Sequence, residues 1–163
     1  MIALYVTNLG KYNQGYLVYE RLELPYYEGE LEEVLEAIGI NEDYEEWFIS
    51  DYETDLEIKI GEYSNIEYLN DFVKEIEGVD INIINGIAEH HTDNPEEILS
   101  IIRNESYSIL SNVETEHDLG LAIAEEFHNV SLNDFISSYI DYEQIGRDSG
   151  YTFMDGSMAL EIY

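Results

Sequence analysis

Hydrophobic and polar residues follow two different periods along this chain, which predicts a mixture of strands and helices. Apolar residues that alternate with polar ones, or that form short runs between turn residues, predict strands. Apolar residues at i, i+3, i+4 and i+7 predict amphipathic helices. The expected strands are 2–7, 16–24, 45–51, 56–60, 107–110, 151–154 and 158–162, and the expected helices are 29–38, 64–78, 81–87, 95–102, 115–127 and 131–145. The pattern therefore predicts an α+β fold.

Capping residues and turn residues support these boundaries. Gly39 is expected to end the first helix, and Asn94 before Pro95 is typical of a helix start. Capping boxes, in which a Ser or Thr precedes an acidic residue by three positions, are expected at Ser64 with Glu67, Thr115 with Asp118 and Ser131 with Asp134. Residues 8–15 are rich in turn formers and predict a loop, while Asp155-Gly156 predicts a type I′ hairpin turn.

The order of these elements predicts three small modules. Residues 1–61 form an acidic α+β module, residues 62–104 a helical module, and residues 105–163 a second α+β module. No internal repeat or flexible linker separates them. We therefore expect an arrangement in which the modules follow one another closely.

The charge of the chain is extreme for its length. Six basic residues against 37 acidic ones among 163 give a formal net charge of -31. Nucleic acids and anionic lipids require cationic contacts, so direct binding to either is disfavoured and a basic protein partner is favoured. The absence of cysteine excludes disulfides and zinc-thiolate sites. No apolar run reaches the 18 residues of a membrane span, which predicts a soluble intracellular protein.

The acidity is concentrated in residues 28–57, which contain no Lys or Arg. A block of like charges is usually disordered. Here Leu31, Val34, Leu35 and Ile38 give the block an apolar face, so it is expected to fold. A disordered acidic tail would be terminal, a halophile surface fits the abundance of Glu and Ile poorly, and solubility needs a net charge of only about 2–8. A partner that recognises the charge explains it better.

Candidate catalytic and metal sites are weak. Acidic residues from Asp51 to Glu62 match the ligand spacing of a calcium loop, but Leu56 replaces the required Gly and Lys59 adds a positive charge. His90 and His91 are adjacent, whereas a helical two-His site needs i, i+4 spacing. No catalytic group, metal or cofactor is expected.

The charge spacing favours mimicry of DNA. Carboxylates at i and i+4 of a helix lie about 5–6 Å apart, similar to phosphates along one strand. Glu28, Glu32 and Glu36 fall on one such row with Glu33 beside them. Tyrosines among the acids, such as Tyr52, either pack under a charged rim or belong to a recognition surface.

The chain resembles the ArdA antirestriction family over essentially its full length. The residues that carry the resemblance are Asn8-Leu9-Gly10-Lys11-Tyr12-Asn13 with Gly15, Asp51-Tyr52-Glu53, Leu119-Gly120, Tyr139-Ile140-Asp141-Tyr142-Glu143 and Arg147-Asp148. One departure is Gly146, where the family pattern has Ala. Glycine inside a helix costs about 1 kcal/mol, which predicts that the helix ends there.

The resemblance implies an elongated three-module homodimer in the bacterial cytoplasm. Such a protein occupies the DNA-binding groove of type I restriction–modification enzymes, on the methyltransferase core, and blocks restriction and, to a variable degree, modification. A dimer would carry a formal charge of twice -31, or -62, equivalent to the phosphates of about 30 base pairs. The alternative is an acidic module for another basic DNA-binding or histone-like protein.

Three sets of residues follow from this hypothesis. The expected DNA-mimic surface comprises Glu28, Glu32, Glu33, Glu36, Glu42, Asp43, Glu45, Glu46, Asp51, Glu53, Asp55, Asp71, Glu75, Glu116, Asp118, Glu125, Glu126 and Asp134. The antirestriction motif maps onto Leu119, Gly120, Tyr139, Asp141, Tyr142, Glu143, Arg147 and Asp148, which either hold the C-terminal module together or contact the enzyme. Tyr107 and Ile109 are the candidate dimer contact.

Overall fold

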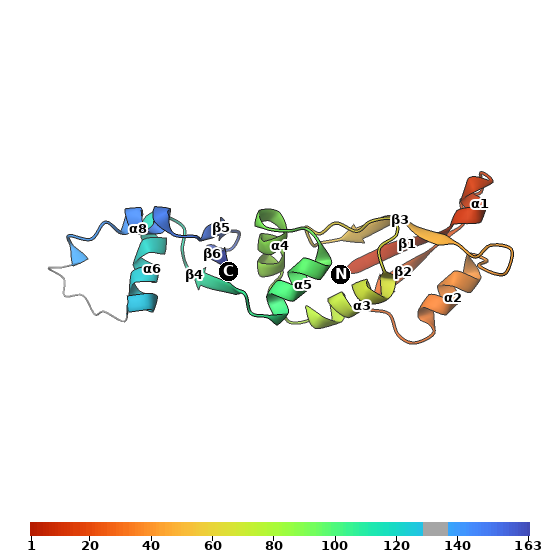
Figure 1. The fold of residues 1–163 in the computed structure, drawn as a ribbon, viewed down its shortest axis with the longest axis horizontal. Coiled ribbons are helices and arrows are strands. Elements are labelled where there is room, and N and C mark those ends of the chain that lie inside the picture. Colours follow the sequence, from red (N-terminus) through yellow and green to blue (C-terminus); the bar gives the residue numbers. More distant parts are fainter. Residues whose placement is uncertain (129–136) are drawn as a thin grey trace. The chain divides into compact units, whose positions relative to one another are not determined.

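A computed structural model of the chain describes residues 1–128 and 137–163 (Figure 1). The strands are β1 (Ile2–Asn8), β2 (Tyr19–Leu24), β3 (Trp47–Thr54), β4 (Tyr107–Ser111), β5 (Thr152–Met154) and β6 (Met158–Ile162). The helices are α1 (Leu9–Asn13), α2 (Glu30–Ala37), α3 (Ile66–Glu75), α4 (Ile81–His90), α5 (Pro95–Arg103), α6 (Glu116–His128) and α8 (Tyr142–Asp148). The predicted α+β class is confirmed.

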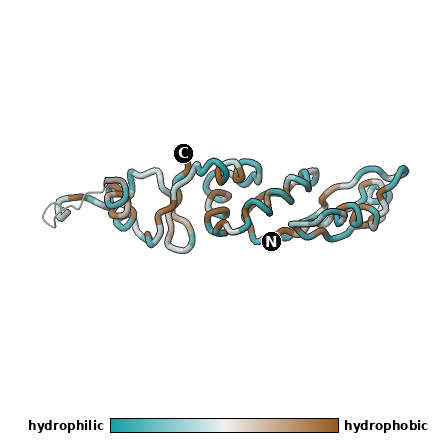
Figure 2. Tube along the Cα trace, turned by 90° about the horizontal axis from the view of Figure 1, so that it is seen from below, coloured by the Kyte–Doolittle hydropathy of each residue, from teal (hydrophilic) through white to brown (hydrophobic). Residues whose placement is uncertain are grey.

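The chain forms two compact units. Unit 1 comprises residues 1–79 and 93–99, and unit 2 comprises residues 80–92 and the described part of 100–163. Hydrophilic and hydrophobic residues alternate along the described chain in both units (Figure 2). Within the described ranges, no helix is long and apolar enough to cross a membrane. The division into three modules stays a prediction.

Unit 1 is built on an antiparallel sheet with the strand order β2-β1-β3. In β1, Ile2, Leu4 and Val6 are fully buried, and Leu4 lies opposite Leu22 of β2. Helices α2 and α3 both pack against β2 (Figure 1). As predicted, α2 turns its apolar side inward, with Val34 buried, and the helix ends before Gly39, which has a φ of +79°. Its polar side is left for solvent.

The loop expected over residues 8–15 is wrong, because its first part is helix α1. The Asn8 side chain accepts a hydrogen bond from the Lys11 amide at 2.9 Å and so caps this helix. The chain then reverses, with the Tyr16 amide donating to the Lys11 carbonyl at 3.0 Å. Strand β2 therefore begins at Tyr19 rather than at residue 16.

The strand expected over residues 56–60 is also wrong. Leu56, Ile58 and Ile60 are buried, and Glu57 and Lys59 between them are exposed, as the alternation predicted. However, the Lys59 amide donates to the Asp93 carbonyl at 2.9 Å, and no strand pairs with this segment in the described ranges. The alternation reflects packing of an extended segment without a β-ladder.

The predicted helix starts are largely confirmed. Thr115 and Asp118 form the capping box of α6, and the Asn94 side chain accepts from the Glu96 amide at 2.8 Å at the start of α5. The cap of α3 differs from the prediction. It is Asn65, which accepts from the Tyr68 amide at 3.1 Å, whereas Ser64 accepts from the Gly61 amide and closes the preceding turn.

Among its described residues, unit 2 contains an antiparallel sheet with the order β4-β6-β5 together with α4, the end of α5, α6 and α8. Its core includes Leu110, Val113, Leu119 and Ala159. The predicted hairpin is present, but its left-handed residues are Gly156 and Ser157, one position later than a type I′ turn at Asp155-Gly156 requires. The extra loop residue shifts the turn.

The helix expected over residues 131–145 is only partly testable. Its cap, Ser131 with Asp134, lies outside the described residues. The predicted extension to residue 145 is wrong, because residues 140–141 are not helical and α8 begins at Tyr142. The predicted end at Gly146 is wrong as well, since α8 continues through it to Asp148.

Candidate functional site

The most acidic element of unit 1 is α2, and we call Glu28, Glu32, Glu33 and Glu36 the α2 glutamates. All four are exposed, and none has a cationic partner within the described part of the chain. The predicted helical row is wrong for Glu28, which precedes the helix because Gly29, with a φ of +94°, forms its N-cap. Acids in the first turn stabilise the positive N-terminus of a helix, but Glu36 lies near its negative end. The helix therefore needs support at its C-terminus.

That support comes from the N-terminal family motif. The Lys11 ammonium donates to the carbonyl of Ile38 at 2.8 Å. The side-chain amide of the buried residue Asn8 donates to the carbonyls of Ile38 and Gly39 at 3.2 and 3.3 Å. These bonds satisfy carbonyls at the end of α2 and place a positive charge against its dipole. The motif thus anchors the acidic helix on the sheet, which residue types alone did not reveal.

The turn after α2 carries a second group of acids. The Asn41 side chain accepts from the Asp43 amide at 2.8 Å and shapes the turn. A hollow of about 340 Å³ is lined by Gly10, Tyr44 and the predicted acids Glu42, Asp43, Glu45 and Glu46. A Cβ atom on Gly10 would lie 2.5 Å from a ring carbon of Tyr44, so this motif glycine is needed for the close approach of α1. We call this feature the acidic hollow.

The predicted acids on β3 and directly after it are partly paired within the protein. Glu53 accepts from the Tyr5 hydroxyl at 2.8 Å and lies 3.7 Å from the Arg21 guanidinium. The same hydrogen bond raises the pKa of Tyr5. Asp55 pairs with the N-terminal ammonium, which lowers the pKa of its carboxyl. Part of the charge on this strand is therefore offset within the protein, while Asp51 is exposed.

Some of the remaining predicted acids lie near a cationic side chain, and others are exposed. In unit 1, Asp71 lies 3.9 Å from the Lys74 ammonium, and Glu75 is exposed on α3. In unit 2, Glu125 and Glu126 are exposed on α6. Asp134 lies outside the described residues.

Two further acids of unit 2 have structural partners. Glu116 accepts from the Arg147 side chain at 3.2 Å. Asp118 accepts from the Thr115 hydroxyl at 2.7 Å, and this hydrogen bond lowers the pKa of the Asp118 carboxyl. Both carboxylates therefore help to fix the start of α6.

The apolar part of the C-terminal motif forms a close helix crossing. Leu119 and Tyr142 are buried. A Cβ atom on Gly120 of α6 would lie 1.8 Å from the Tyr142 carbonyl oxygen, and one on Gly146 of α8 would lie 1.9 Å from the Glu116 carbonyl oxygen. Neither backbone leaves room for a side chain, so glycine is required on both helices at their point of contact.

The polar part of the motif holds the same pair of helices. Asp141 caps α8 by accepting from the Gln144 amide at 3.0 Å, and Asp148 accepts from the Gln144 side chain at 2.7 Å. Arg147 joins Glu116 of α6 to Glu143 of α8, the latter at 2.7 Å. Tyr139 is 76% exposed. Most motif residues thus have contacts within unit 2.

The candidate dimer residues lie on an outer strand. Tyr107 and Ile109 belong to β4, which pairs only with β6 among the described strands, opposite Ile162 and Leu160. Both side chains are half-buried. An outer strand offers unpaired backbone groups to a second chain.

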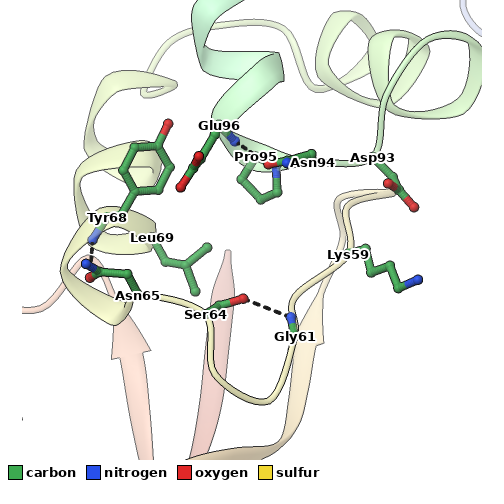
Figure 3. Close-up of a pocket in the computed structure, with 10 residues that line it drawn as sticks. All are labelled: Lys59, Gly61, Ser64, Asn65, Tyr68, Leu69, Asp93, Asn94, Pro95 and Glu96. Carbon is green, nitrogen blue, oxygen red and sulfur yellow. Dashed lines mark hydrogen bonds between the residues drawn. The ribbon is translucent and has the colours of Figure 1, made fainter.

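A hollow of about 390 Å³ beside the starts of α3 and α5 was not predicted (Figure 3). Lys59, Asp93 and Glu96 are its charged lining residues. Asn65 and Asn94 cap the two helices with their own side chains, so these helix starts already have acceptors. In the described ranges, no group of three or more His, Cys, Asp or Glu residues could hold a metal ion. The hollow thus presents no evident chemistry.

Comparison with known proteins identifies the family. A family model described as "Antirestriction protein (ArdA)" matches residues 4–159 of this chain. That span includes Asn8 and Lys11, the α2 glutamates, and the C-terminal motif as far as Asp148. No curated protein matches the chain. Because the match covers nearly all of its length, the chain belongs to the ArdA family of antirestriction proteins.

Proposed function

We propose that the chain inhibits type I restriction–modification enzymes by mimicking DNA. The observation that carries this proposal is the set of α2 glutamates, which are exposed and have no cationic partner within the described residues. Glu32 and Glu36 lie one helical turn apart, a spacing of about 5–6 Å that is close to that of the phosphates of one DNA strand. A groove that binds phosphates with Lys and Arg would attract the same pattern.

The anchoring of α2 supports this proposal. A flexible acidic segment would lose conformational entropy on binding, whereas a helix already fixed to a sheet loses less. Lys11 and Asn8 hold the C-terminal end of α2, and Val34 buries its apolar side. The charge is therefore presented in a defined arrangement before the partner binds.

The assembly and setting belong to the proposal too. We infer a homodimer in the bacterial cytoplasm that binds the methyltransferase core, excludes DNA from it, and blocks restriction and, variably, modification. The outer strand β4 with Tyr107 and Ile109 is the proposed dimer contact, since it can extend the sheet of a second copy. No catalytic step, metal or cofactor enters this mechanism.

Binding to a purified type I methyltransferase core at increasing salt tests the role of the α2 glutamates. We expect that changing all four to Gln weakens binding and flattens the salt dependence, because fewer charge contacts are then made. A matched control carries the same change at four exposed glutamates outside the predicted surface, namely Glu62, Glu77, Glu97 and Glu105. Equal losses in both variants would show that only total charge matters.

Single substitutions give a second readout. Because the proposed contact is spread over many carboxylates, Glu32→Gln alone should change the Kd by less than about threefold. If one such change abolished binding, the acids would form a specific site and not a distributed mimic. The proposal would then fail even if the family assignment holds.

A further inference from the structure

Unit 1 exposes a group of large side chains that neither its core nor the charge of α2 explains. We call Tyr12, Tyr16, Leu17 and Tyr19 the aromatic patch. Their exposed fractions are 52%, 65%, 64% and 50%. Single exposed apolar residues are common, but several within one short segment mark an interaction surface more often.

The fold brings these residues together at one end of unit 1. After α1, the Gly15 amide donates to the Tyr12 carbonyl at 2.9 Å, and the Tyr16 amide donates to the Lys11 carbonyl at 3.0 Å. The Asn8 amide then donates to the Val18 carbonyl at 3.0 Å. Residues 16–18 therefore run back beside α1.

Two of the rings are held in place from one side. The Tyr12 ring packs edge-on against Phe48, with centroids 5.3 Å apart, and the Tyr19 ring packs edge-on against Tyr5 at 5.7 Å. Half of each of these tyrosines nevertheless stays exposed. Rigid rings with a free side bind partners at little cost in side-chain entropy.

The rim of the patch is negative. Gly10 of α1 lines the acidic hollow, and the Glu46 carbonyl accepts from the Leu9 amide at 3.0 Å, so the carboxylates of the hollow lie beside α1. The nearby cations are already engaged. Lys11 donates to the end of α2, and Arg21 pairs with Glu23 and Glu53. The patch thus combines aromatic surface with an excess of carboxylates.

We propose that the aromatic patch binds arginine side chains of a basic protein partner. A guanidinium is planar and weakly hydrated, so it can stack on a tyrosine ring while it donates to a neighbouring carboxylate. Lysine lacks this planar group and gains less from the rings. The inference deepens the proposed function and rests on it for the identity of the partner, because it assigns this part of the surface to arginine rather than to charge alone.

Octa-arginine and octa-lysine peptides test the patch directly, because they carry equal charge. For the wild-type chain we expect tighter binding of octa-arginine, by about fivefold at moderate salt. The Tyr16→Ala/Tyr19→Ala double variant should lower this preference at least twofold. Tyr16→Phe, which keeps the ring, should retain it, and so should Tyr63→Ala, a control at a tyrosine that is 72% exposed outside the patch.

An unchanged arginine preference in the double variant would overturn the inference. Thermal unfolding of each variant shows whether the fold is intact, and Tyr16→Ala alone serves as the second variant if loss of the Tyr19–Tyr5 contact lowers the Tm. The peptides do not depend on a type I enzyme. Failure of the patch and failure of the proposed function are therefore separate results.

Discussion

Helix propensity and packing predict opposite effects of a Gly146→Ala change on the stability of the protein. Gly146 lies inside α8, and Gly→Ala in a helix interior is expected to stabilise by about 1 kcal/mol. The crossing with α6 predicts the reverse. The new Cβ would lie 1.9 Å from the Glu116 carbonyl oxygen and 2.8 Å from its carbonyl carbon, both backbone atoms that cannot rotate away.

The magnitude follows from the space required. Carbon–oxygen contacts are normally about 3.3–3.6 Å, so the two backbones must separate by more than about 1 Å. Overpacking of this kind costs about 1–3 kcal/mol, and the reciprocal contact of Gly120 with the Tyr142 carbonyl opens at the same time. Set against the gain of about 1 kcal/mol in propensity, we expect a net loss of up to about 2 kcal/mol in the free energy of unfolding.

Urea denaturation of the Gly146→Ala variant measures this difference. The matched control is Gly61→Ala, where the new Cβ would meet only the Ser64 hydroxyl oxygen at 3.5 Å and the backbone is not left-handed. We expect little change for the control. An increase in stability for Gly146→Ala would refute the crossing as described and would leave helix propensity as the dominant effect.

Two further perturbations test the supports of the acidic helix and of α6. Lys11→Met removes the donor to the Ile38 carbonyl, so amide hydrogen exchange in α2 should become faster, with a loss of about 1–2 kcal/mol in local stability; unchanged exchange would contradict an anchoring role. Thr115→Ala should raise the pKa of the Asp118 carboxyl towards its ordinary value, as followed by NMR titration, because the hydroxyl that lowers it is gone. Because folding lowers the pKa of the Asp118 carboxyl, this group stabilises the fold fully at a pH above its pKa in the unfolded chain. That stabilisation is lost as the pH falls through its pKa in the folded chain. A wild-type cap that persists at a pH below the folded-state pKa would argue against this.

Much of the fold could be predicted because the signals are local. The capping box of Thr115 with Asp118, the Asn94-Pro95 start and the Gly39 stop each involve neighbouring residues, and each was confirmed. The alternation over residues 56–60 correctly predicts which side chains are buried. It was wrong as a strand because a ladder depends on a partner that the local sequence does not contain.

The candidate site shows the same limit. Exposure of Glu32, Glu33 and Glu36 follows from helical periodicity. The role of Lys11, however, depends on a contact with Ile38, which is distant in the sequence. The low helix propensity of Gly146 predicts a helix end at this position. Its actual requirement comes from the backbone of Glu116 on another helix. Tertiary contacts of this kind explain motif residues that composition cannot.

Competition with DNA for a purified type I methyltransferase core is the decisive test of mimicry. With labelled DNA already bound, we expect the chain to displace it at low salt and to do so less well at moderate salt, because both ligands use the same cationic groove. A complex that holds the chain and DNA together would contradict mimicry. Absence of binding at low salt would also contradict it and would direct the search to other basic proteins, such as histone-like ones.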